Sequence, residues 1–156
     1  MMLTVKQDTF KLKLIIEPNY YTQPRKNYNN EDSGNIIYTD RDSLYQCLKK
    51  KNEISKPCKS KSDLQYFDEA NYKIEEFPKD KKNILGYKCF KIIAKRNDEY
   101  LKHTYEMYVT DKIKLDFNYL INFKSLNSKY LILELKRTTP MEGNYYGYIT
   151  NSIKLD

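Results

Sequence analysis

Cys89 and His103 are the nucleophile and base that a cysteine-type hydrolase would need. A thiol becomes a useful nucleophile only when a base or a positive charge lowers its pKa, and the two groups must lie within hydrogen-bonding reach. Cys89 lies in the middle of the run YKCFKIIAK, a setting typical of a small buried thiol rather than a reactive one. His103 is the single histidine of the chain. We therefore expect no catalytic residues and no enzymatic activity.

Other motifs that carry chemistry are missing from the sequence. Cys47, Cys58, Cys89 and His103 are spaced too widely for a structural zinc site, whose ligands usually come in two close pairs. The four glycines are isolated, which excludes both the dinucleotide-binding G-x-G-x-x-G and the P-loop. The nucleophile motif G-x-S-x-G does not occur either. We expect no metal and no cofactor.

The three cysteines do not form a complete set of pairs. Cys47 and Cys58 could close a short loop as a disulfide in an oxidising compartment. Three reduced thiols fit the same spacing, and the sequence does not choose between the two.

Alternation of apolar and polar residues predicts the elements that would position these groups. It is clear at 12–16, 84–94, 105–110 and 131–136, and a shorter strand is predicted around Tyr72 and Ile74. We expect Pro18 and Pro78 to end strands, 36–51 to favour strand over helix, and 52–63 to be a polar connection. The run 112–129 is predicted to be a helix or an irregular crossover, and a last strand begins near Tyr145. Six or seven strands with frequent turns indicate a mainly β fold, with an antiparallel sheet that is either curved or sandwiched, in one domain over residues 1–156.

The chain is basic, with 28 Lys and Arg against 21 Asp and Glu and a formal charge of +7. The two signs are mixed along the chain, which is typical of an ordinary hydrated surface. A basic interaction module that binds an acidic protein or nucleic acid is the alternative function, with nucleic acid the less favoured partner. No apolar run is long enough to span a bilayer, so we expect no transmembrane segment.

Three blocks of the sequence, KKNILGYKCFKIIAK, YEMYVTDKI and YLILELK, lie in this order between Tyr72 and Lys136. They resemble the GLPGLI family of Bacteroidetes proteins and its relatives of unknown function, which read K-x-I-L-G-Y-x-C, then an aromatic extended segment, then GLPGLILEI. This chain has Asn127-Ser128-Lys129-Tyr130 where that family has Gly-Leu-Pro-Gly. It therefore looks like a divergent branch, and whatever the family does through that loop is not carried over.

The resemblance implies an exported protein of the periplasm or cell surface. It also implies a distant likeness to periplasmic lipoprotein carriers, whose single curved antiparallel sheet forms a half-barrel with a short helix or long loops covering one face. Such carriers hold acyl chains in an apolar hollow and perform no chemistry. The expected function is then a non-catalytic, carrier-like domain. Its partner would be a lipid, a hydrophobic small molecule or another envelope protein.

An apolar concave face of this kind would be lined by alternate strand residues. The predicted ligand-binding residues are Phe90, Ile92, Met107, Val109, Leu131 and Leu133. A register error of one residue would exchange the two faces of a strand and invert this choice.

Overall fold

The computed structural model describes side chains over residues 69–96, 103–115, 118, 121–138, 147–150 and 152–154. Elsewhere it describes only the backbone of strands. The strands are β1 (Val5–Lys6), β2 (Leu12–Asn19), β3 (Ser33–Asp40), β4 (Ser43–Lys50), β5 (Glu53–Ser60), β6 (Tyr72–Ile84), β7 (Tyr87–Arg96), β8 (Thr104–Thr110), β9 (Ile113–Lys114), β10 (Leu131–Thr138) and β11 (Tyr145–Leu155).

Nine of these strands form one antiparallel sheet in the order β5-β4-β3-β2-β11-β10-β8-β7-β6. Side chains are described along five of them, from β11 to β6. The terminal strands β5 and β6 are not paired with each other among the described strand pairs, so the sheet is not closed. The described residues contain no helix, and accordingly none long and apolar enough to cross a membrane. The fold class is mainly β, as the alternation predicts.

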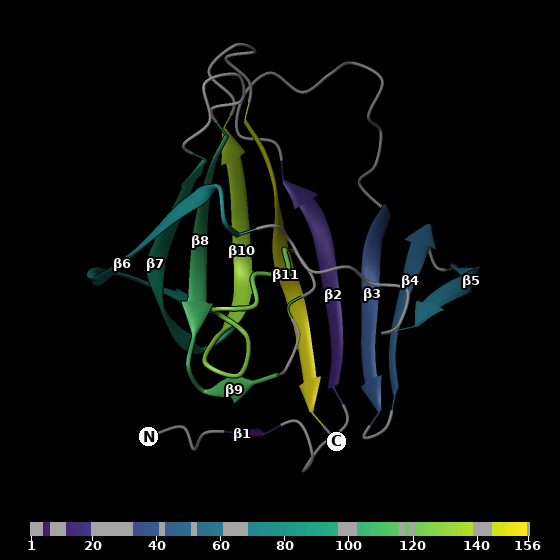
Figure 1. Ribbon diagram of the computed structural model, residues 1–156. Coiled ribbons are helices and arrows are strands. Elements are labelled where there is room, and N and C mark those ends of the chain that lie inside the picture. The colour runs from purple at the N-terminus through teal and green to yellow at the C-terminus, as the bar shows by residue number, and fades with distance from the viewer. Residues whose placement is uncertain are drawn as a thin grey trace.

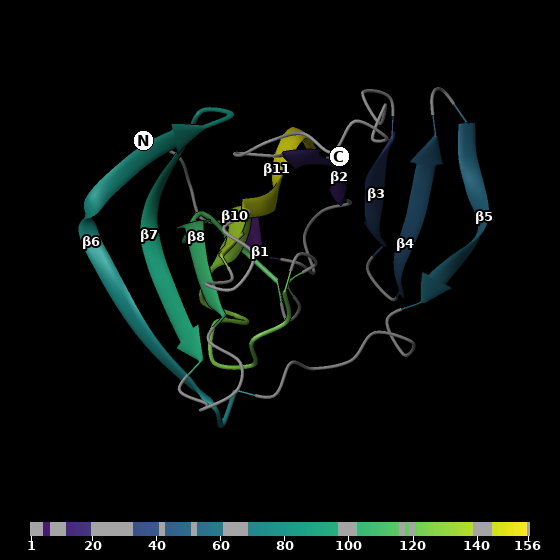
Figure 2. The same ribbon diagram turned by 90° about the horizontal axis from the view of Figure 1, so that it is seen from above.

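The strands of the sheet follow an arc when seen from above (Figure 2). The segment of residues 121–130, here called the covering segment, connects β9 to β10 and lies on the inner side of that arc (Figure 1). It contains turns but no strand or helix. The expected cover of one sheet face is thus an irregular segment rather than a helix.

Three predicted strand boundaries are wrong. The strand predicted over 84–94 begins only at Tyr87, because Ile84 ends β6 and a turn follows it. β2 continues through Pro18 to Asn19, and β6 continues through Pro78 to Ile84. β6 is the last strand of the sheet, and the pairing of β6 with β7 shifts register between Phe77 and Lys81. Because proline lacks an N–H donor, an edge strand with a bulge is where it is tolerated. The sequence around 52–63, predicted to be a polar connection, contains β5 instead.

β6 and β7 form a hairpin whose connection is only Leu85 and Gly86, because Ile84 pairs with Tyr87. Both connecting residues have positive φ, 52° for Leu85 and 83° for Gly86, as in the type I′ turn that suits a twisted hairpin. Asparagine, aspartate or glycine is the usual residue at the first of these positions. A leucine held there costs about 1–2 kcal/mol in backbone strain.

Candidate functional site

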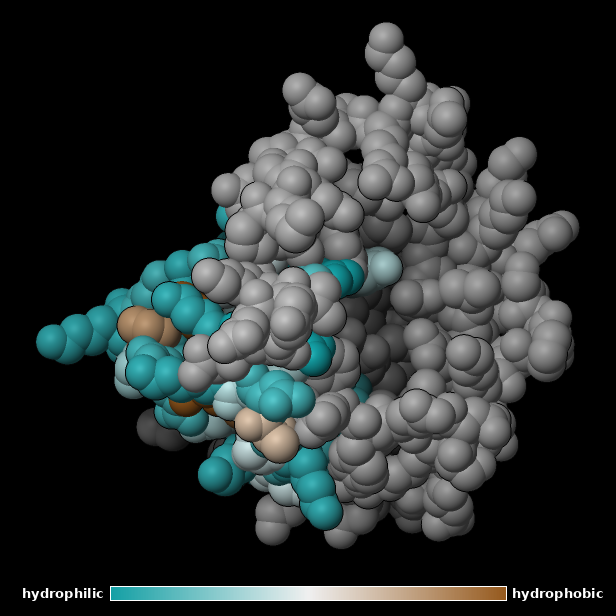
Figure 3. Space-filling model, turned by 45° about the horizontal axis from the view of Figure 1, so that its top comes forward, coloured by the Kyte–Doolittle hydropathy of each residue, from teal (hydrophilic) through white to brown (hydrophobic). Residues whose placement is uncertain are grey.

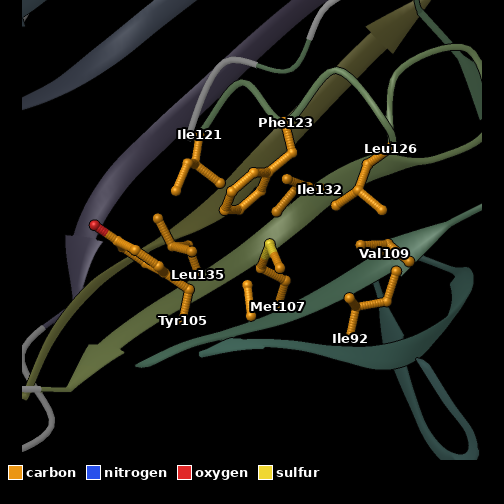
Figure 4. Packing of buried hydrophobic residues seen from close by; sticks show 10 residues of the cluster. Ile92, Tyr105, Met107, Val109, Ile121, Phe123, Leu126, Ile132 and Leu135 are labelled. Carbon is orange, nitrogen blue, oxygen red and sulfur yellow. The ribbon is translucent and has the colours of Figure 1, made fainter. Parts of the chain in front are cut away.

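One face of β7, β8 and β10 carries buried apolar side chains that pack beneath the covering segment (Figure 4). Ile92 pairs in register with Met107, and Phe90 with Val109, so these side chains share a face. Phe123 of the covering segment points onto this face and is itself fully buried. The buried members of this set, the covered cluster, are Ile92, Ala94, Tyr105, Met107, Val109, Ile121, Phe123, Leu126, Ile132 and Leu135.

Aromatic rings close the covered cluster at its margins. Phe123 meets Tyr72 edge to face, with ring centroids 5.5 Å apart, and Tyr105 at 6.4 Å. Phe90, which is half-buried, meets Tyr130 edge to face at 5.1 Å. Edge contacts of this kind add to the stabilisation that burial of the rings gives.

Asparagine side chains hold the covering segment to the start of β10. The buried Asn118 side chain accepts a hydrogen bond from the Ile132 N–H at 2.8 Å and donates to the Tyr130 carbonyl and the Asn127 amide oxygen, both at 3.0 Å. Asn127 donates in turn to Asn122 at 2.6 Å. Because these amide groups satisfy one another, they can be buried without a large desolvation cost. We call Asn118, Asn122 and Asn127 the asparagine latch.

Further hydrogen bonds tie the covering segment to residues outside it. The Ser128 N–H donates to the Leu115 carbonyl at 2.6 Å, and the Ser125 N–H donates to Glu69 at 2.7 Å. The Tyr130 hydroxyl donates to Glu76 at 3.1 Å. Apolar packing and side-chain hydrogen bonds, rather than a strand ladder, therefore hold this cover in place.

Cys89 belongs to a second set of buried residues, the cysteine cluster, which consists of Ile84, Cys89, Ile113, Leu115, Leu131 and Leu133. Its thiol is directed to the Tyr87 carbonyl at 3.5 Å, and the residue is only 2% exposed. Burial raises the pKa of the Cys89 thiol to about 12. The thiolate that nucleophilic chemistry needs is therefore strongly disfavoured in the folded protein.

A polar network lies beside the cysteine cluster. The buried carboxylate of Glu134 forms an ion pair with Lys82 at 2.5 Å. Lys91 pairs with Asp80 at 2.9 Å, and the Tyr108 hydroxyl donates to the same carboxylate at 3.0 Å. The Tyr108 ring lies 5.1 Å from the Lys82 ammonium and 5.5 Å from that of Lys91. These contacts join β6, at its bulge and just after it, to β7, β8 and β10.

The hydrogen bonds with Lys91 and Tyr108 lower the pKa of the Asp80 carboxyl. Burial, and then the hydrogen bond to Asp80, raise the pKa of the Tyr108 hydroxyl. Both shifts favour the charge states that the network already contains, an ionised carboxylate and a neutral phenol. The arrangement is a structural ion-pair network.

His103 does not lie next to Cys89. Arg96 N–H donates to the His103 carbonyl at 2.8 Å, which places the histidine opposite the end of β7, whereas Cys89 lies near the start of that strand. The His103 ring instead contacts the Arg137 guanidinium at 3.1 Å. Within the described ranges, no three His, Cys, Asp or Glu side chains are grouped so that they could hold a metal ion.

The structure divides the six predicted ligand-binding residues between the two clusters. Ile92, Met107 and Val109 lie in the covered cluster and Phe90 packs against it, whereas Leu131 and Leu133 lie in the cysteine cluster. The pairing of β8 with β10 shifts register between Ile132 and Glu134, which breaks the simple alternation along β10. That these residues bind a ligand stays a prediction.

Cys47 and Cys58 lie on the neighbouring strands β4 and β5, and their side chains lie outside the described residues. The disulfide between them stays a prediction.

The sequence predicted a helix or an irregular crossover over 112–129, but it did not identify the residues of this segment that pack on the sheet face. Ile121, Phe123 and Leu126 show neither a period of two nor a helical period. Their apolar character within the run INFKSL was the one available signal. Nothing in the sequence singled out Asn118 as a buried amide.

Comparison with known proteins adds two distant structural similarities. One is to a DUF1329 family protein from Desulfovibrio piger, at 8% identity over 96% of this chain and 88% of that chain, with a TM-score of 0.26. The other is to a putative outer membrane lipoprotein-sorting protein domain from Vibrio parahaemolyticus, at 9% identity over 94% of this chain and 83% of that chain, with a TM-score of 0.22. At these scores neither similarity bears on function. No family model and no curated protein matches the chain, so the GLPGLI resemblance stays a prediction.

Proposed function

We propose that this protein is a non-catalytic, carrier-like binding domain of the cell envelope that holds a lipid acyl chain or another hydrophobic molecule. The ligand would lie on the inner face of the open sheet, a half-barrel like that of periplasmic lipoprotein carriers. It would take the place of the side chains with which the covering segment now fills that face.

One observation carries the proposal, which is that an irregular segment closes the apolar inner face. Met107 and Val109 are fully buried, yet what buries them includes Phe123 and Leu126 from a segment without a ladder of backbone hydrogen bonds to the sheet. Such a cover can open while the strands beneath it stay paired, because opening breaks apolar contacts, the asparagine latch and single hydrogen bonds such as that of Ser128 with Leu115, but no strand pairing. An apolar ligand would replace the contacts that the cover gives up.

Titration with a fluorescent fatty acid tests this function directly. The wild-type protein is expected to bind the probe saturably, and mass spectrometry of protein purified from an envelope extract should detect a lipid that leaves on solvent extraction. Failure of the wild-type protein to bind the probe, together with no extracted lipid, would overturn the proposal.

Two variants decide whether the ligand uses the covered cluster. Phe123→Ala removes the largest side chain that a ligand must displace, so it should bind the probe more tightly than the wild type. Leu133→Ala removes a fully buried side chain of the cysteine cluster and serves as the matched control. Equal changes in both variants, each with an unchanged far-ultraviolet circular dichroism spectrum, would place the ligand elsewhere and contradict the proposed site.

A further inference from the structure

The two large apolar side chains that stand out as exposed in the described part of the chain both belong to β6 and its turn. Leu85 is 46% exposed and Phe77 is 38% exposed. In the view of Figure 3, hydrophilic residues make up most of the described surface and only isolated hydrophobic residues interrupt it. Leu85 belongs to neither buried cluster.

Lysines surround the turn that carries Leu85. The hairpin from Lys79 to Lys91 contains five lysines and one aspartate. Lys82 and Lys91 are engaged in the polar network, whereas Lys79, Lys81 and Lys88 are exposed and form no ion pair with any described carboxylate. The tip of the hairpin is therefore an apolar side chain within a positive field.

Edge protection explains only part of this composition. Lysines, a proline and a bulge on a terminal strand keep it from pairing with another chain, and β6 has all three. Protection of the edge requires no exposed leucine, and it does not require that leucine at a positive φ. The substitution Leu85→Asn would relieve the backbone strain and replace the exposed apolar side chain with a polar one.

We propose that the β6–β7 hairpin tip contacts an anionic lipid surface. Leu85 would enter the boundary between headgroups and acyl chains, and Lys79, Lys81 and Lys88 would lie against the negative headgroups. Apolar insertion combined with attraction of lysines to anionic lipids is the physical basis of interfacial binding. The tip is separate from the covered cluster, so this contact does not depend on the proposed carrier function.

Co-sedimentation with vesicles tests the contact. Wild-type protein should bind vesicles of phosphatidylcholine and phosphatidylglycerol, bind pure phosphatidylcholine vesicles far less, and dissociate as salt is raised. Leu85→Asn, which suits the turn, should lower the partition coefficient by about tenfold or more while the protein stays at least as stable.

Charge-reversal variants show whether vesicle binding depends on lysines at the hairpin tip or only on the net charge of the chain. Lys81→Glu with Lys88→Glu should weaken binding by about thirtyfold or more. Lys95→Glu with Lys129→Glu changes the net charge equally at exposed positions away from the turn, and should have a much smaller effect. If the wild-type protein does not bind anionic vesicles, the proposal is overturned. That result is expected if the tip binds an acidic protein instead. Equal losses in both double variants, or unchanged binding of Leu85→Asn, overturn it as well.

Discussion

The covered cluster and the cysteine cluster share the strands β7 and β10 but differ in what closes them. The irregular covering segment and its asparagine latch close the covered cluster. The cysteine cluster includes Ile113 and Leu115, from β9 and just after it, and Tyr87, Tyr108, Tyr148 and Ile153 pack against it. The Lys82–Glu134 ion pair lies beside it. One face of the sheet is therefore covered by a segment outside the strands, whereas the other is packed by residues of the hairpin strands, β9 and β10. Under the proposed function, the first face would admit the ligand while the second keeps the sheet intact.

Removal of Phe123 should have the largest effect on stability. Phe123→Ala is expected to lower the free energy of unfolding by about 4 kcal/mol, because a fully buried ring leaves a cavity between the cover and the sheet. Urea unfolding measures this, with Leu133→Ala, expected to cost about 3 kcal/mol, as the control. A loss under about 1 kcal/mol for Phe123→Ala would show that the covering segment is not part of the cooperative fold, which contradicts this expectation.

A substitution at Gly147 tests the pairing of β11 with β10, the strand that contributes residues to both clusters. A Cβ atom at this position would lie 2.0 Å from the Leu135 carbonyl oxygen, which is backbone and cannot move aside. Gly147→Ala should therefore lower the free energy of unfolding by about 3 kcal/mol, because β10 and β11 must separate locally. Ser152→Ala, on the same strand, should change it by less than about 0.5 kcal/mol. A melting temperature for Gly147→Ala equal to that of wild type would show that the close approach is absent in solution.

Breaking the asparagine latch should affect the covered cluster alone. Asn118→Ala leaves the Ile132 N–H and the Tyr130 carbonyl without their present partner, at an expected cost of about 2 kcal/mol. Hydrogen exchange should accelerate first in the covering segment and only later in β7 and β8. Uniform acceleration through the sheet would mean that the two regions are not separable, and the contrast between them would fail.

Sequence reasoning succeeded where a single physical rule acts and failed where several compete. Alternation alone placed β7, β8 and β10 and the residues that share faces on β7 and β8, because side chains on a strand must alternate. It failed at Leu131 and Leu133, since a bulge reverses the faces and no residue type marks that bulge. It also failed at Pro78, where an edge position makes the missing N–H harmless, and edge position is a property of the whole sheet. The packing of the covering segment could not be predicted, because it depends on tertiary contacts and not on a periodic pattern of apolar residues.

Cys89 gives the test with the smallest expected effect. Above about pH 9, the thiol stays protonated only while the cysteine cluster stays closed. The unfolded thiol loses its proton near pH 9, whereas burial raises the pKa of the Cys89 thiol to about 12 in the folded protein. Between these values the unfolded chain binds fewer protons than the folded one. Stability should therefore fall by about 1.4 kcal/mol for each pH unit above about 9, and be unaffected by this thiol below that pH.

Cys89→Ala isolates this slope, since Tyr108, Tyr130 and Lys91 titrate in both proteins and cancel in the difference. Urea unfolding at a series of pH values should show the variant losing less stability than wild type as the pH rises. Native alkylation of Cys89 at pH 8, followed by peptide mass spectrometry, should be slow and should not accelerate in Asn118→Ala. Rapid alkylation in that variant would mean that opening the cover also opens the cysteine cluster, and that one cooperative core underlies both faces.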